Sequence, residues 1–170
     1  MRVTGGKFKN RIITSSNQKA VRPTSSKMRE AIFSMIGQNL EGNSFLDAFG
    51  GSGIMGVEAY SRGAYPVVIT EKNATSFRKI TDAISDLKAD IVVKCQDAKR
   101  AIQSAEWDII FLDPPYSFDI QPYLDISFRQ GRYLVIAEME HQKKIDVSSG
   151  WQESKEKIYG TSKLVIFEKD

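Results

Sequence analysis

Short apolar runs alternate with longer segments of helical periodicity through most of the chain. The apolar runs predict strands near 44–48, 66–70, 91–94, 108–112 and 132–138. The segments between them predict helices near 54–62, 73–88, 97–104 and 119–129. This alternation is typical of a parallel sheet with helices on both of its faces.

The two ends of the chain depart from this alternation. Residues 151–158 and 162–167 are strand-like runs with no room for a helix between them, so we expect an antiparallel hairpin at the sheet edge. Residues 2–14 have apolar or β-branched positions on both sides of Gly5-Gly6, which predicts a β-hairpin arm. The expected fold class is α/β, with a mostly parallel seven-stranded sheet and an N-terminal hairpin.

A further helix is expected between the arm and the first strand. Thr24 or a neighbouring serine can cap its N-terminus, and Gly37 follows its last turn. Arg29 lies on a polar face, from which it could reach a ligand. The apolar positions recur at helical spacing and should face the core; they are Met28, Ala31, Ile32, Met35 and Ile36.

Length and composition fit one globular domain, with 170 residues of which 41% are hydrophobic and 26% charged. We treat 1–170 as a single domain, with an arm over 1–21 and a core over 22–170. No apolar run approaches a membrane span, no signal peptide is visible, and the single cysteine cannot form an internal disulfide. These features predict a cytoplasmic, monomeric protein without membrane contact.

Positive charge is concentrated at the N-terminal end. The whole chain carries a net charge of +3. Residues 1–30 hold eight basic residues and one acidic residue, whereas 31–170 hold 16 basic and 20 acidic residues. The basic segment is either a solvated face or a phosphate-binding arm. The residues that could contact a nucleic acid are Lys7, Lys9, Arg11, Arg22, Thr24 and Arg29.

The strand near 108–112 ends in a loop suited to chemistry. Two prolines stop the strand and leave carbonyls without sheet partners, beside the Asp113 carboxylate and the Tyr116 ring. Such acceptors suit the amine of a nucleobase that has left its helix, with the ring stacked on the base. A plain turn with an exposed aromatic residue is the alternative. The predicted catalytic residues are Asp113, Pro114, Pro115 and Tyr116.

A second loop, rich in glycine, follows the strand near 44–48 and leads into a helix. Glycines there allow positive φ and close backbone approach, and the helix N-terminus offers free N–H groups to a ligand. Residues 51–56 satisfy the dinucleotide pattern G-x-G-x-x-G, and Glu71 lies about 20 residues on, where a ribose acceptor belongs. This pattern alone would give weak support to NAD.

The position of Asp47 favours S-adenosyl-L-methionine instead. A carboxylate ends the strand and Phe49 precedes the glycines, whereas in dinucleotide sites the first glycine follows the strand directly. Asp47 can hold the ammonium of that cofactor or a water, Glu71 its ribose, and Asp97 its adenine amine, although helix capping is the alternative role of Glu71 and Asp97. The predicted cofactor-binding residues are Asp47, Phe49, Gly50, Gly51, Ser52, Gly53, Glu71, Lys72, Asp97 and Ala98.

Two sets of motifs resemble known enzymes. Asp47-x-Phe49-x-Gly51-x-Gly53 with the Asp-Pro-Pro-Tyr loop is similar to amino-methyltransferases of the Rossmann-like class I fold. The segments 2–6, 22–24 and 29–33 narrow the resemblance to the RsmD family of 16S rRNA guanine-N2 methyltransferases, over about residues 1–140. The family often has isoleucine at the position of Thr4 and arginine-glycine near Lys9-Asn10, so this chain departs from it in the arm.

The resemblance implies methylation of one guanine amine in 16S rRNA, on the small ribosomal subunit or an assembly intermediate. Two alternatives stay open at this point. A DNA adenine-N6 methyltransferase would use the same loop, but 170 residues leave no room for a separate target-recognition domain. The other alternative is a non-catalytic nucleic-acid-binding module that has kept a nucleotide pocket.

Overall fold

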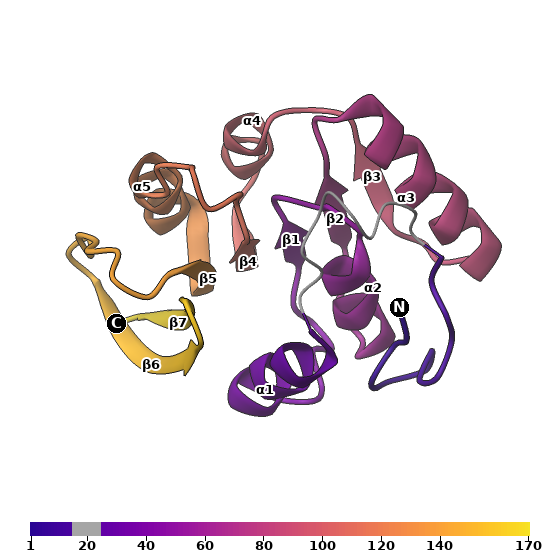
Figure 1. Cartoon of the computed structure of the whole chain (residues 1–170), viewed down its shortest axis with the longest axis horizontal. Coiled ribbons are helices and arrows are strands. Elements are labelled where there is room, and N and C mark those ends of the chain that lie inside the picture. Colours follow the sequence, from indigo (N-terminus) through magenta and orange to yellow (C-terminus); the bar gives the residue numbers. More distant parts are fainter. Residues whose placement is uncertain (15–24) are drawn as a thin grey trace.

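The computed structural model describes residues 1–14 and 25–170, which form a seven-stranded sheet flanked by helices (Figure 1). The helices are α1 (Ser26–Ile36), α2 (Ile54–Ser61), α3 (Ala74–Leu87), α4 (Ala98–Gln103) and α5 (Gln121–Gln130). The strands are β1 (Phe45–Asp47), β2 (Val67–Thr70), β3 (Val92–Lys94), β4 (Trp107–Leu112), β5 (Gly131–Glu140), β6 (Trp151–Tyr159) and β7 (Ser162–Lys169). The predicted elements of the sheet and its helices are confirmed, with ends that differ by one or two residues.

The strands follow the order β3-β2-β1-β4-β5-β7-β6 across the sheet. Strands β1 to β5 pair in parallel, whereas β7 is antiparallel to both β5 and β6. Among the described strands β7 is therefore the reversed one, and β6 runs in the parallel direction. The predicted hairpin at the sheet edge is confirmed, and its second strand is the one that pairs with β5.

Both faces of the central strands are covered, which explains why β1, β2 and β4 are buried at every position. Alternate residues face opposite sides: Phe45 and Phe111 pack with α1, α2 and α3, while Leu46 and Leu112 pack with α4 and α5. In Figure 1, α4 and α5 lie above the row of strands, and α1 and α2 lie below it. The helices on the two faces fix the parallel strands β1 to β5, whose carboxyl ends lie at one edge of the sheet.

The N-terminus of helix α1 is capped by Ser25, and a serine was one of the two capping residues that the sequence predicted. The Ser25 side chain accepts a hydrogen bond from the Met28 N–H at 3.2 Å, and the other candidate, Thr24, lies outside the described residues. Gly37 ends the helix with φ of 109°, in the left-handed region that favours glycine. Ile32 and Phe33 are fully buried, so the helix is fixed by its apolar face.

The N-terminal arm is paired, but it is not a regular hairpin. Arg2 and Ile12 form an isolated antiparallel bridge, and the N–H of Val3 donates to the Arg11 carbonyl at 2.9 Å. Residues 5–10 form bends and turns between these pairs. Val3 and Ile13 are buried in the same cluster as α1, α2 and α3. The prediction of pairing is confirmed, and Val3 and Ile13 anchor the arm in the core while its lysines stay exposed.

The arm docks on the last turn of α2, where Figure 1 shows it running beside that helix. The N–H of Lys7 donates to the Ser61 carbonyl at 2.8 Å, and the Ser61 hydroxyl donates to the Gly5 carbonyl at 2.6 Å. A Cβ on Gly6 would lie 1.8 Å from the Ser61 carbonyl oxygen. Glycine is therefore required for the approach of the two backbones, not only for a turn.

A buried carboxylate fastens this contact. Glu58 of α2 is 0% exposed and lies 3.3 Å from Arg29 Nε and 3.4 Å from Arg62 Nε. It also accepts a hydrogen bond from the Thr4 N–H at 2.6 Å, while Arg29 donates to the Arg2 carbonyl at 2.8 Å. Arg29 is 2% exposed. Its guanidinium thus faces the protein interior, and it has no surface to offer an RNA phosphate.

Candidate active site

Four acidic side chains follow neighbouring strands at one edge of the sheet. Asp47 ends β1, Asp113 follows β4, and Glu71 and Asp97 come after β2 and β3. Because β1, β2, β3 and β4 are parallel, their carboxyl ends share an edge. The strand order reverses between β1 and β4, and a crevice at such a switch point is where open α/β sheets bind ligands.

The glycine loop between β1 and α2 folds tightly against β2. Gly51 and Gly53 have φ of 54° and 76°, and the Gly50 N–H donates to the Thr70 carbonyl at 2.7 Å. A Cβ on Gly50 would lie 2.7 Å from the Ile69 Cγ2 atom. The glycines are therefore needed to press the loop onto the sheet and to aim the α2 N-terminus along this edge.

Asp47 is a buried carboxylate, and one of its two oxygens lacks a hydrogen-bond partner among the described residues. It is 1% exposed, and its Oδ2 accepts a hydrogen bond from the Gly56 N–H at 3.2 Å. Its Oδ1 is buried and accepts no hydrogen bond within the described part of the chain. Burial raises the pKa of Asp47 from 3.8 to about 7; Glu71 adds to the rise, and the hydrogen bond from Gly56 opposes it. A cationic ligand group at Oδ1 would restore the charged form.

Glu71 and Asp97 both take part in local hydrogen bonds. Glu71 accepts from the Gly51 N–H at 3.0 Å and from the Asn73 N–H at 2.7 Å, which ties β2 to the glycine loop. Asp97 caps α4 by accepting from the Lys99 N–H at 2.8 Å. Each carboxylate has further lone pairs, so these bonds leave room for ribose hydroxyls and an adenine amine. The exposed Lys72 and the buried Ala98 adjoin them in the chain.

The loop after β4 places its polar groups at the surface. Asp113 and Pro114 are half-buried, Pro115 is exposed, and Tyr116 is 42% exposed. The Phe118 N–H donates to the Pro115 carbonyl at 2.9 Å, which closes a turn behind the tyrosine. The Tyr116 side chain therefore lies at the surface, as stacking on a base requires.

Three aromatic rings join the glycine loop to this second loop. The Phe49 ring lies 6.0 Å from Phe118 and 5.2 Å from Tyr123, and Phe118 lies 5.5 Å from Tyr123. Burial raises the pKa of Tyr123, and the charge of Asp97 adds to the rise. Nothing in the sequence indicates that Phe118 meets Phe49. The contact fixes the two loops relative to each other.

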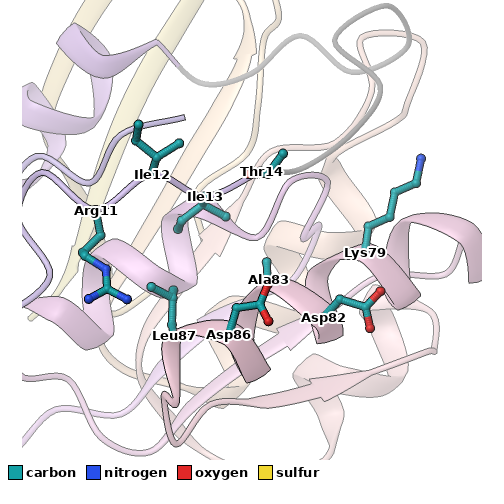
Figure 2. Close-up of a pocket in the computed structure, with 9 residues that line it drawn as sticks. All are labelled: Arg11, Ile12, Ile13, Thr14, Lys79, Asp82, Ala83, Asp86 and Leu87. Carbon is teal, nitrogen blue, oxygen red and sulfur yellow. The ribbon is translucent and has the colours of Figure 1, made fainter.

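A separate groove of about 190 Å³ lies between the arm and α3 (Figure 2). Arg11, Ile12 and Thr14 line one side, and Asp82 and Asp86 of α3 line the other. In Figure 2 the Arg11 side chain extends toward α3. Arg11 thus shares its surroundings with acidic groups, and it is exposed, as Lys7 and Lys9 are. Arg22 and Thr24 lie outside the described residues.

No helix in the described part of the chain is long and apolar enough to cross a membrane. Within residues 1–14 and 25–170, no group of three or more His, Cys, Asp or Glu side chains could hold a metal ion.

The sheet order with its reversed seventh strand, together with the glycine loop and the Asp-Pro-Pro-Tyr loop at one edge, defines a class I methyltransferase that depends on S-adenosylmethionine. The family described as "Conserved hypothetical protein 95" matches residues 1–168. The chain belongs to this family, which is the RsmD family.

Two named relatives illustrate the match. The Bacillus subtilis protein "Putative rRNA methyltransferase YlbH" is 37% identical over 126 residues, which cover 68% of this chain and 67% of the relative. The Haemophilus influenzae protein "Ribosomal RNA small subunit methyltransferase D" is 26% identical over 172 residues, covering 94% and 89% of the two chains.

Solved structures show the same fold. The putative methyltransferase yhhF from Escherichia coli has a TM-score of 0.88 at 22% identity and covers 100% of this chain and 98% of its own. The T. thermophilus 16S rRNA N2 methyltransferase RsmC, solved with AdoMet and guanosine, has a TM-score of 0.69 at 19% identity. It matches 90% of this chain and 44% of its own.

We expect S-adenosylmethionine to bind more weakly as the pH falls through about 7. Because the pKa of Asp47 is raised to about 7, protonation at lower pH removes the negative charge that we predict to hold the ammonium of this methyl donor. Affinity should drop roughly fivefold to tenfold between pH 7.5 and pH 6, a range in which an α-amino group stays mostly charged. Titration calorimetry at several pH values measures this, and in buffers of different ionisation enthalpy it also reports the proton released on binding.

The control variant is Asp47→Asn, which keeps an oxygen for the Gly56 N–H but cannot titrate. Its donor affinity should be low and nearly independent of pH. A donor affinity of the parent protein that does not change between pH 6 and pH 7.5 would exclude a contact between Asp47 and the ammonium.

Proposed function

We propose that the protein transfers a methyl group from S-adenosylmethionine to the exocyclic N2 amine of a guanine in small-subunit ribosomal RNA. The observation that carries this proposal is the position of Asp113. It follows β4, the strand that pairs with β1, so an acceptor for a base amine stands beside the donor's glycine loop. The family membership and the names of the relatives support an RNA substrate.

Three residues of the loop have a task in this reaction. S-adenosylmethionine supplies an electrophilic methyl group on its sulfonium. Asp113 and the Pro114 carbonyl accept the two N–H groups of the amine, which directs the nitrogen lone pair toward the methyl carbon. Asp113 can take the proton that the amine loses after transfer. Tyr116 stacks on the base once it has left its helix.

The donor side is assigned to the residues of the sheet edge. Asp47 holds the ammonium directly or through water, Glu71 the ribose hydroxyls, and Asp97 the adenine amine. The glycine loop lies against the methionine part. Its N–H groups and the N-terminus of α2 face the same edge. A cytoplasmic location follows from a ribosomal RNA substrate and belongs to this proposal.

The test is methyl transfer from labelled donor to small ribosomal subunits, naked 16S rRNA and DNA. The expected result is label in the rRNA on a guanine N2, with subunits or their assembly intermediates as the better substrate, and the labelled nucleotide is then mapped. Label on adenine in DNA would support an adenine-N6 methyltransferase instead. Donor binding with no transfer to any of the three would indicate a non-catalytic binding module.

The arm should contribute phosphate contacts that depend on salt. Changing Lys7, Lys9 and Arg11 together to alanine should flatten the log–log dependence of RNA affinity on salt by about two to three units, at about 0.7–0.9 per contact. Phosphate contacts do not read bases, so affinity should fall for all RNAs while the modified guanine stays the same. Filter binding or fluorescence anisotropy over a salt series measures the slope.

A matched control removes three basic side chains, Arg129, Lys155 and Lys157, from α5 and the edge strand β6. This control should leave the slope unchanged. If the arm variant binds and methylates subunits like the parent at every salt concentration, the arm cations are only a solvated surface.

A further inference from the structure

A second acidic side chain lies directly beside the amine-binding loop. In the parallel pairing of β4 with β5, Leu112 stands opposite Ala137, so Asp113 and Glu138 are the next residues of the two strands. Glu138 also pairs with Leu164 of β7, which fixes its backbone within the sheet. It is 7% exposed. A nearly buried carboxylate on a rigid strand is therefore held next to the predicted acceptor for the base amine.

The surroundings of Glu138 belong to the acceptor side of the site. It lines a small hollow together with Pro114, Pro115 and Tyr116 of the loop. Two further charged residues line the same hollow. One is Glu140, which is exposed. The other is Lys143, and its Nζ lies 3.6 Å from Asp119 Oδ1. Glu138 is the one of these that combines burial with a position next to Asp113.

The chemistry of the bases indicates what such a carboxylate can recognise. An ionised carboxylate only accepts hydrogen bonds. In guanine the 2-amine is flanked by the N1–H donor, whereas in adenine and cytosine the ring nitrogen beside the amine on the Watson–Crick edge is an acceptor. A carboxylate at this place therefore attracts guanine and repels the other two amine-bearing bases.

We propose that Glu138 is a specificity-determining residue, which accepts the N1–H of the target guanine while Asp113 and the Pro114 carbonyl hold its 2-amine. This inference rests on the proposed function and adds to it the means by which guanine is chosen. It also explains why an Asp-Pro-Pro-Tyr loop, which alone would suit any base amine, would act on guanine in this chain.

The test replaces the target guanine by 2-aminopurine in rRNA reconstituted into small subunits. 2-Aminopurine keeps the 2-amine but has no hydrogen on N1, so the parent enzyme should methylate it at least ~100-fold more slowly than guanine, because a site built for an N–H rejects an analogue that lacks it. In Glu138→Gln the amide can donate to the bare N1. This variant should lose activity on guanine, and the ratio of its methylation rates on guanine and 2-aminopurine should fall to about tenfold or less.

The matched control is Glu140→Gln, which removes a charge from the same hollow and should keep the ratio of the parent. Donor binding to Glu138→Gln, measured by calorimetry, should equal that of the parent. If Glu138→Gln slows transfer to both bases equally, its role is structural and the inference is overturned. The parent enzyme gives an answer without any variant, since equal rates on guanine and 2-aminopurine would also overturn it.

Failure of the proposed function gives a different result. In that case the parent would not methylate subunits that contain the normal guanine. Activity of the parent on guanine with no discrimination against 2-aminopurine would leave the proposed function intact and remove only the role of Glu138.

Discussion

Replacing Asp113 by alanine should lower the rate of methyl transfer by at least ~100-fold and leave the fold and donor binding nearly unchanged. Asp113 lies past the end of β4 and is half-buried, so the apolar layers on both faces of that strand do not depend on it. Its hydrogen bond matters most as the amine becomes a nucleophile, because the lone pair must then leave the base ring. Single-turnover rates with saturating donor report this step without product release.

A second aspartate in the same loop serves as the control. Asp119 is exposed, accepts from the Gln121 N–H at 3.3 Å and pairs with Lys143. Asp119→Ala should keep a rate within about twofold of the parent, since exposed ion pairs contribute little. Near-normal turnover of Asp113→Ala would remove Asp113 from the mechanism, whatever its position beside the donor loop.

Strands β1 to β5 and the helices could be predicted because each of these strands contains a short apolar run and most of the helices are bounded by polar or glycine residues. The same rule places Asp47, Glu71, Asp97 and Asp113 together, since the carboxyl ends of parallel strands meet at one edge. No knowledge of side-chain contacts is needed for either prediction. The residues predicted to bind the methyl donor could therefore largely be identified from the ends of the strands.

Contacts between distant segments could not be predicted in this way. Nothing in the local pattern brings Phe118 to Phe49, or Glu138 to the strand position beside Asp113, because each arrangement depends on which strands are neighbours. Arg29 shows the opposite error. A basic residue on the polar face of a helix is expected to be exposed to solvent. Arg29 is buried instead, because its partner Glu58 lies in a helix that is buried on nearly all sides.

The helix α2 contains a local signal for this buried charge. Seven of its eight residues are buried, and Tyr60 is the exception. A helix without a polar face leaves an ionised residue within it no route to water, so Glu58 requires basic partners from other elements. The basic N-terminal segment supplies one of them in Arg29. Part of the charge that predicted an RNA-binding arm is therefore used inside the fold.

Glu58→Gln should consequently be among the most destabilising single substitutions in the chain, lowering the free energy of unfolding by about 3–5 kcal/mol. The amide keeps the volume and an acceptor for the Thr4 N–H, but it leaves two buried guanidinium groups, Arg29 and Arg62, without a counter-charge. Urea unfolding at constant pH, with a shift of the midpoint at unchanged slope, measures the loss.

The control for this substitution is Glu106→Gln, which breaks the exposed pair with Arg132 and should leave the midpoint within experimental error. Because Arg29, which loses its counter-charge, donates to the Arg2 carbonyl of the arm, the arm should loosen before the sheet does. Amide exchange in residues 3–13 of Glu58→Gln should then be faster than in the parent, while β4 and β5 stay protected. Unchanged stability together with unchanged exchange in the arm would show that Glu58 does not hold the arm to α2.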